Sequence, residues 1–230
     1  MAESKDSIHR LGYDVLMIIA DHVHRRDVNS LTQASKHLKS QFLRRLYRDD
    51  VLQDNDALKW AVRNGKVDTI ASWIELGDAD VNEAFHVAAT GRHYASSETP
   101  LALAIRHCQR PCVKYLLARG ADANGEVEGR TERGPPDWMF LCHPVESVLW
   151  KTWYIDEKID GNHGDAEDMM GILEDLLHHG ADPARVTRDL IENLGICAED
   201  QETSTLSRAL ALIKAAHVRT PVEDKEDAGE

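Results

Sequence analysis

Apolar residues recur at the spacing of an α-helix in three short stretches near the start of the chain. They are Val15, Leu16, Ile18, Ile19 and Val23 in the first stretch, Val28 and Leu31 in the second, and Leu38, Phe42, Leu43, Leu46 and Tyr47 in the third. Asp14, Asp27 and Ser35 stand where each helix would begin, and their side chains can accept hydrogen bonds from the free amides of a first turn. We therefore expect three short helices, with the apolar residues of the first on one face. So small a lobe should dock on the neighbouring part of the chain.

A short phrase occurs three times in the rest of the chain. It reads Gly-Asp-Ala-Asp at 77–80 and Gly-Ala-Asp at 120–122 and at 180–182, each time after an apolar pair. Residues 99–104, which read Thr-Pro-Leu-Ala-Leu-Ala, and residues 56–61 precede the first two phrases at the same offset. A Pro or Ala after Thr or Asp starts a helix, and a left-handed Gly ends one. Each unit is therefore expected to be a helix pair followed by a turn.

These units resemble ankyrin repeats over residues 51–218. The family's Thr-Pro-Leu-His signature has lost its His, because Lys59, Ala102 and Glu146 occupy that position. The hydrogen bond that this His makes between helices in the family must then be lost or replaced, so we expect irregular stacking. A last helix pair without the turn phrase would end the stack.

The repeats are longer than those of a regular ankyrin array. Asp80 and Asp122 are 42 positions apart, and Asp122 and Asp182 are 60 apart, whereas the ankyrin period is about 33 residues. The additional residues fall in connections, around 86–98, within 125–142 and between Trp150 and Met169. Stacked repeats tolerate insertions at such places, because each helix pair contacts only its neighbours.

The N-terminal stretch resembles a second family. Residues 11–16 read Leu-Gly-Tyr-Asp-Val-Leu, and Ile18-Ile19, Arg26-Asp27-Val28, Leu31 and Ser35 follow. Over residues 8–48 this pattern is similar to an F-box, especially those of fungal proteins, although Gly12 and Leu38 replace the family's usual Pro and Trp. The resemblance implies docking onto the small adaptor subunit of a cullin-RING ubiquitin ligase. The residues it implies as adaptor-facing or lobe-forming are Leu11, Val15, Leu16, Ile19, Val28 and Leu31. The alternative is a helical cap that hides the first apolar face of the repeats.

Charge and composition narrow the class of protein. The chain carries 27 Lys and Arg against 40 Asp and Glu, a net charge of −13, which disfavours a nucleic-acid partner. Residues 1–50 have a net charge of +2 and residues 51–230 one of −15, so the two parts look like different modules. The longest apolar run, residues 15–20, is far shorter than the roughly 20 residues of a membrane helix, and no secretory signal opens the chain. We expect reduced cysteines, no membrane partner, and a cytosolic or nuclear protein.

Candidate catalytic and metal sites are few. The chain has no phosphate-binding Gly-rich loop, zinc-hydrolase motif or serine elbow, so we expect no catalytic residue, no cofactor and no enzyme. Cys108, Cys112 and Cys142, with His107 and His143, have the composition of a zinc site. They would lie about 12 Å apart along the predicted helices, because roughly eight helical residues separate their levels. We therefore expect no metal site there.

Residues 156–167 match a calcium-binding loop in part, with Asp156, Asp160, Gly161 and Glu167 at the expected positions. Lys158 places an ammonium group at the third ligand position. We therefore expect a hydrated connection between two helices, without calcium.

An aromatic cluster is the most informative feature of the second insertion. Trp138, Met139 and Phe140 follow two prolines in a segment without helical spacing. They either fold back over the stack or offer exposed anchors to a partner. Arg130 and Arg133 could supply a charged rim, which would place a partner-binding surface along residues 86–98 and 125–142.

The sequence as a whole predicts an all-α protein. Residues 8–50 would form the F-box-like lobe and residues 51–218 the ankyrin-like solenoid, while residues 1–7 and 219–230 would be disordered. The expected function is protein binding, as the substrate receptor of a cullin-RING ubiquitin ligase with an unidentified protein target. The alternatives are an enzyme of fungal metabolism with a pocket built on the repeats, and a plain ankyrin scaffold.

Overall fold

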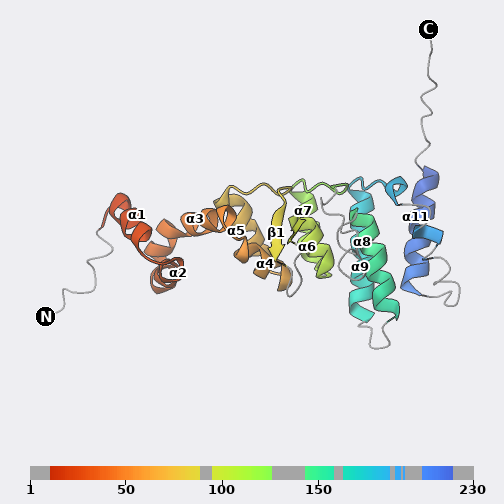
Figure 1. Ribbon diagram of the computed structural model, residues 1–230, viewed down its shortest axis with the longest axis horizontal. Coiled ribbons are helices and arrows are strands. Elements are labelled where there is room, and N and C mark those ends of the chain that lie inside the picture. Colours follow the sequence, from red (N-terminus) through yellow and green to blue (C-terminus); the bar gives the residue numbers. More distant parts are fainter. Residues whose placement is uncertain are drawn as a thin grey trace, which may run out of the picture. The chain divides into compact units, whose positions relative to one another are not determined.

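The computed structural model describes residues 11–88, 95–125, 143–157, 163–186, 190–192, 194 and 204–219. The chain divides into two compact units, Met1–Glu83 and Ala84–Glu230. Figure 1 shows that the regular elements of both units are helices, apart from the strands near the start of the second unit. The all-α prediction is confirmed, with a small hairpin added. Residues 1–7 and 220–230 lie outside the described residues, and the last helix includes Arg219.

The first unit holds five helices among its described residues. They are α1 (Tyr13–His22), α2 (Arg25–Ala34), α3 (Lys36–Leu52), α4 (Asp56–Arg63) and α5 (Val67–Gly77). Helix α2 packs on α3, α4 packs on α5, and α3 packs on α5. Helix α3 thus belongs both to the N-terminal lobe and to the first repeat, because it runs through the predicted boundary at residue 50.

The helix starts agree with the sequence only in part. Ser35 caps α3 as predicted, since its hydroxyl oxygen accepts a hydrogen bond from the amide of His37 at 3.2 Å. The caps of α1 and α2 are Gly12 and His24, so Asp14 and Asp27 were wrong predictions. Both carboxylates lie in the first turn, where the helix dipole favours negative charge without a cap bond.

A buried carboxylate joins the lobe to the first repeat. Asp50 is 1% exposed and accepts hydrogen bonds from the Arg25 guanidinium and, at 3.1 Å to each oxygen, from the amide of Ala57 in the first turn of α4. Asn55, the residue before α4, is left-handed and makes no side-chain cap bond. Asp50 therefore accepts the hydrogen bond of a free amide in the first turn of α4, although it lies seven residues before Ala57. It thereby joins α2, α3 and α4.

The second unit is a stack of helix pairs. Its elements are β1 (Phe85–Ala88), β2 (Ala95–Glu98), α6 (Pro100–Arg106), α7 (Arg110–Ala118), α8 (Pro144–Glu157), α9 (His163–His178), the short 3-10 helix η3 (Pro183–Arg185) and α11 (Thr205–Arg219). Helices α6 and α7 pair, as do α8 and α9, while α6 packs on α8 and α7 on α9. Helix α11 covers α8 and α9. The same stacking of second helices joins α3 to α5 in the first unit, so α2 and α3 are packed like one more helix pair.

The insertion at residues 86–98 forms a hairpin that the sequence did not predict. Strands β1 and β2 pair antiparallel, with Phe85 opposite Glu98 and Ala88 opposite Ala95. Each strand is only four residues long, which is too short for an alternating pattern to stand out. The side chain of Glu98 is buried and pairs with Nη1 of Arg106 at 2.6 Å. This ion pair fixes the end of the hairpin to α6.

The three turn phrases share one local structure. The amides of Asn82, Asn124 and Ala184 donate to the Oδ1 atoms of Asp80, Asp122 and Asp182, at 2.9, 2.8 and 2.9 Å respectively. These side chains close the turns in the way that Asp favours. The repeated aspartate of the sequence thus has a repeated structural role.

The calcium-like segment is mostly helical. Helix α8 extends to Glu157 and α9 begins at His163, while residues 158–162 lie outside the described residues. Glu167, the twelfth position of the motif, accepts a hydrogen bond from Arg208 of α11 at 2.7 Å. Its carboxylate is therefore used between helices, and the absence of calcium binding stays a prediction.

Candidate protein-binding site

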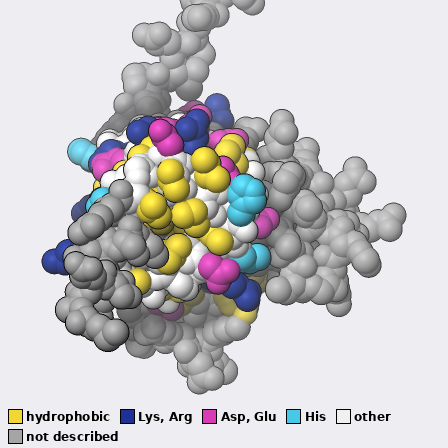
Figure 2. All heavy atoms as spheres, turned by 90° about the vertical axis from the view of Figure 1, so that its left-hand side faces the viewer, with side chains coloured by type: hydrophobic (Ala, Val, Ile, Leu, Met, Phe, Trp, Pro, Cys, Tyr) yellow, Lys and Arg dark blue, Asp and Glu magenta, His cyan; other side chains and the backbone are white. Residues whose placement is uncertain are grey.

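Helix α1 carries apolar residues both on its buried side and on its exposed side. Leu16 and Ala20 are buried, whereas Val15, Ile18 and Ile19 are 45%, 58% and 37% exposed. Figure 2 shows hydrophobic side chains gathered on the side of the first unit that carries α1, with charged and His side chains around them. The prediction that all apolar residues of this helix share one face was wrong. On a helix of 3.6 residues per turn, Ile18 lies about 160° from both Leu16 and Ala20, and Val15 and Ile19 form the stripe next to them.

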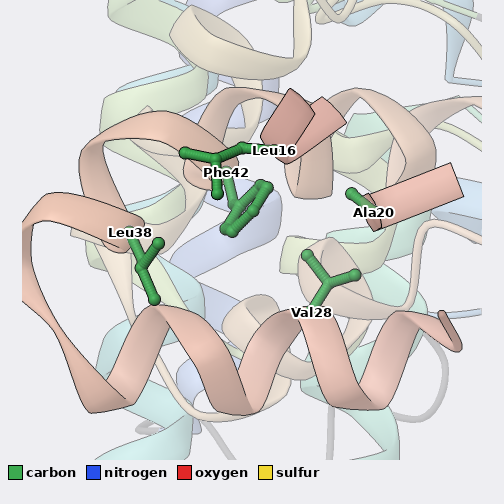
Figure 3. Close-up of a cluster of buried hydrophobic side chains, with 5 residues drawn as sticks. All are labelled: Leu16, Ala20, Val28, Leu38 and Phe42. Atoms are coloured by element: carbon green, nitrogen blue, oxygen red, sulfur yellow. The ribbon is translucent and has the colours of Figure 1, made fainter. Parts of the chain in front are cut away.

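The inner side of α1 completes the core of the lobe. Leu16 and Ala20 pack with Val28 of α2 and with Leu38 and Phe42 of α3, as Figure 3 shows. The partly buried side chains around this cluster are Leu11, Met17, Val23, Leu31 and Leu46. The core therefore uses only part of the apolar surface that α1 carries.

The six residues implied by the F-box resemblance separate into two groups. Leu16 and Val28 are core residues, and Leu11 and Leu31 pack partly against the core. Val15 and Ile19 are exposed. Ile18 is more exposed than either but was not among the predicted residues. The signal that could have identified it was the continuous apolar run of residues 15–20, which is too long for one face. We call Val15, Ile18 and Ile19 the outer face of α1.

A hydrogen-bond network joins the second and third turns of the repeats. The Oδ1 of Asn124 accepts from the amide of Asp182 at 2.7 Å, its Nδ2 donates to the carbonyl of Gly180 at 2.9 Å, and its own carbonyl accepts from Arg185 at 3.2 Å. The Nε2 of His143 lies 3.1 Å from Asn124 Oδ1. These contacts hold two turns of the second unit in register.

His143 joins the start of α8 to the preceding turn. Its Nδ1 accepts from the amide of Val145 at 3.3 Å, at the start of α8, so Nε2 carries the proton and donates to Asn124. His143 lies three positions before Glu146 and is buried. Its two contacts join the start of α8 to the turn that holds Asn124, and the fate of the family's bond between helices stays a prediction.

The two cysteines within the described residues are structural in character. Cys112 is fully buried, and burial raises its pKa to about 11. Burial also raises the pKa of Cys108. Such thiols are poor ligands and poor nucleophiles at neutral pH. Across the described residues no three potential metal ligands gather.

The predicted partner-binding residues of the second insertion lie outside the described residues. They are Trp138, Met139, Phe140, Arg130 and Arg133. Of the surface predicted at residues 86–98 and 125–142, the strands of the hairpin and Gly125 are described. The ion pair between Glu98 and Arg106 holds the end of the hairpin beside α6, and the partner-binding surface stays a prediction.

Comparison with known proteins gives a family. A family model described as ankyrin repeats (3 copies) matches residues 12–127, just over half of the chain. The match begins in the lobe, earlier than the 51–218 expected from the sequence, in agreement with the packing of α2 and α3 as a helix pair. No curated protein and no solved structure matches the chain. None of the described helices combines the length and apolar character that crossing a membrane requires.

Because the ankyrin-repeat model matches more than half of the chain, the chain belongs to the ankyrin-repeat family and is a protein-protein interaction module.

Proposed function

We propose that this protein is a substrate receptor of a cullin-RING ubiquitin ligase and that it docks on the adaptor subunit through the outer face of α1. The observation that carries the proposal is the exposure of Val15, Ile18 and Ile19 on one side of a ten-residue helix. The F-box resemblance of residues 8–48 names the adaptor as the partner.

A simple capping role explains only half of α1. A terminal cap of a repeat stack needs an apolar inner side and a polar outer side to stay soluble. Leu16 and Ala20 provide the inner side, but the outer face is apolar too. Burying a fully exposed aliphatic side chain contributes about 1.5 to 3 kcal/mol. The three outer side chains are roughly half exposed, so covering their remaining surface offers a partner about 2 to 4 kcal/mol.

Target binding would use a different part of the chain. We place it on the edge formed by residues 86–98 and 125–142, with Trp138, Met139 and Phe140 as apolar anchors and Arg130 and Arg133 at the rim. A receptor of this kind would act in the cytosol or the nucleus. That the chain is not an enzyme stays a prediction from its sequence.

The docking experiment replaces exposed residues only. Purified adaptor subunit of a cullin-RING ligase is titrated with the wild-type chain and with a double variant, Ile18→Asp and Ile19→Asp. Each aspartate would be desolvated against an apolar partner, so we expect affinity to fall at least about a hundredfold, which is near 3 kcal/mol. Leu16 is unsuitable, because it is buried in the core and its replacement would unfold the lobe.

The matched control is Leu52→Asp. Leu52 lies at the end of α3 and is 75% exposed, so this variant makes the same chemical change away from α1. It should bind the adaptor like the wild type, and all variants should keep their melting temperature. A wild-type chain that never binds the adaptor would remove the ligase role. An equal loss in the double variant and in Leu52→Asp would show that the outer face is not the docking site.

A further inference from the structure

Helix α1 is weakly held by its own local features. Its ten residues are too few for a stable isolated helix, and its N-cap, Gly12, supplies no side-chain hydrogen bond. Tertiary contacts must therefore hold it in place.

Apolar packing alone does not specify which side of α1 faces the lobe. Hydrophobic attraction has no direction and follows the apolar area that is buried. Leu16 and Ala20 form one apolar side and Val15 and Ile19 another, so a rotation of the helix about its axis would exchange apolar surface for apolar surface. A directional contact is needed to select one orientation.

Arg45 of α3 supplies that contact. Its Nη1 donates to the backbone carbonyl of Met17 at 3.3 Å, and its Nη2 donates to the carboxylate of Asp21. Within the described residues these are the polar contacts that join α1 to the other helices of the lobe. The carbonyl and the carboxylate belong to residues four apart, so one planar guanidinium spans one turn of α1.

The guanidinium is itself held from its own helix. Asp49, four residues later on α3, lies 3.5 Å from Nε of Arg45. The side chain of Arg45 is three-quarters buried, and the hydrogen bond to Asp21 raises its pKa further above the usual range. Arg45 therefore stays charged throughout the pH range in which the protein folds.

We infer that Arg45 is a positioning residue for the outer face of α1: its two hydrogen bonds select the orientation in which Val15, Ile18 and Ile19 point away from the lobe. Polar contacts that choose one of several apolar packings are known from helical assemblies. The link from orientation to adaptor affinity rests on the proposed function, but the orientation itself does not.

The orientation is measured by thiol labelling. Ala20→Cys places a thiol on the buried side of α1, and Ile18→Cys places one on the exposed side. Each is combined with Arg45→Gln, and labelling rates of the α1 peptide are followed by mass spectrometry in the full chain. Arg44→Gln is the matched control, because Arg44 is the preceding residue of α3, is 66% exposed and pairs with Asp78 rather than with α1.

We expect Arg45→Gln to raise the labelling rate at Ala20→Cys about tenfold without raising it at Ile18→Cys, while Arg44→Gln changes neither. In an adaptor titration, Arg45→Gln should weaken binding about tenfold if the correct orientation falls to about a tenth of the molecules. Unchanged labelling at Ala20→Cys would overturn the inference. So would a rise at both positions together, because that result means loss of the fold rather than loss of orientation. If the wild-type chain fails to bind the adaptor, the proposed function is lost, and the labelling still decides the role of Arg45.

Discussion

The glycines that begin the three turn phrases have different structural roles. Gly120 and Gly180 adopt φ angles of 88° and 85° at the ends of their helices, where a residue with a Cβ is strained. In the first turn the left-handed residue is Asp78, with φ of 54°. Gly77 instead lies within α5, where a Cβ would come within 2.8 Å of Val51 Cγ2 and 3.2 Å of the Tyr47 carbonyl. The prediction of a left-handed Gly77 was wrong, because α5 continues through Gly77 and Asp78 takes the left-handed position. Gly77 instead leaves room for the close approach of α3.

Cys112 makes stability depend on pH in the alkaline range. Its pKa rises from an ordinary 9.0 to about 11 in the folded protein, because the thiolate would be buried in apolar surroundings. Below pH 9 the thiol of Cys112 is protonated in both the folded and the unfolded state, and the free energy of unfolding has its full value. Between pH 9 and about 11 the unfolded state loses its proton first, so stability falls as pH rises. A difference of two pKa units between the folded and the unfolded state corresponds to about 2 to 3 kcal/mol in the free energy of unfolding.

The check is urea unfolding between pH 8.5 and 10.5 for the wild type and for Cys112→Ala. Other groups titrate in this range as well, but the variant keeps all of them and lacks only this thiol. The wild type should lose more free energy of unfolding with rising pH than the variant does. Parallel pH profiles would show that Cys112 does not contribute.

At the scale of elements, Arg110 ties α7 to α9. Its Nε donates to Asp175 at 2.9 Å, and its guanidinium crosses α9 at Gly171, where a Cβ would come within 2.1 Å of Arg110. The pairing with Asp175 raises the pKa of Arg110. Gly171 thus makes room for a contact between consecutive repeats, although a Gly inside a helix is unfavourable.

Two opposing effects should nearly cancel in Gly171→Ala. Alanine gains about 1 kcal/mol of helix propensity, and displacement of the partly exposed ion pair costs up to about 1 kcal/mol. In an Arg110→Ala background only the gain remains, so there Gly171→Ala should stabilise by about 1 kcal/mol. Urea unfolding of the four proteins in this cycle measures the difference. Equal effects of Gly171→Ala in both backgrounds would contradict the proposed contact.

The elements themselves were predictable to different degrees. Periodicity predicted the helices of the lobe and the helix pairs, and the recurring aspartates predicted the turns. The hairpin was missed, because its strands are four residues long. The two sides of α1 were missed for another reason: its apolar residues cover more of the helix surface than one face holds, so their spacing does not say which of them is buried. Which side of α1 faces the lobe depends on Arg45, which is 28 residues away from Met17. Sequence spacing carries no information about that contact.

At the scale of the whole molecule, the first and last described helices differ in kind. Helix α1 has an apolar outer face, whereas the exposed side of α11 carries Arg208 and Lys214. The inner face of α11 is formed by Leu206, Ala209, Leu210 and Ile213, all buried. An apolar inner side with a polar outer side is what closes a repeat stack. Helix α11 thus has the burial pattern expected of a cap, whereas α1 carries the outer face that we propose for a partner.

The capping role of α11 can be tested at Ile213, which is fully buried. Ile213→Ala removes apolar contacts between α11 and the helices it covers, α8 and α9, and the cavity adds to the loss, so we expect about 2 to 4 kcal/mol of destabilisation. The matched control is Lys214→Ala, the next residue and an exposed one, which should change stability by less than about 0.5 kcal/mol. Amide hydrogen exchange then reports where the loss occurs. If α11 caps the second unit, the amides of α8 and α9 should exchange faster in Ile213→Ala. Faster exchange confined to α11 would mean that the stack is stable without it.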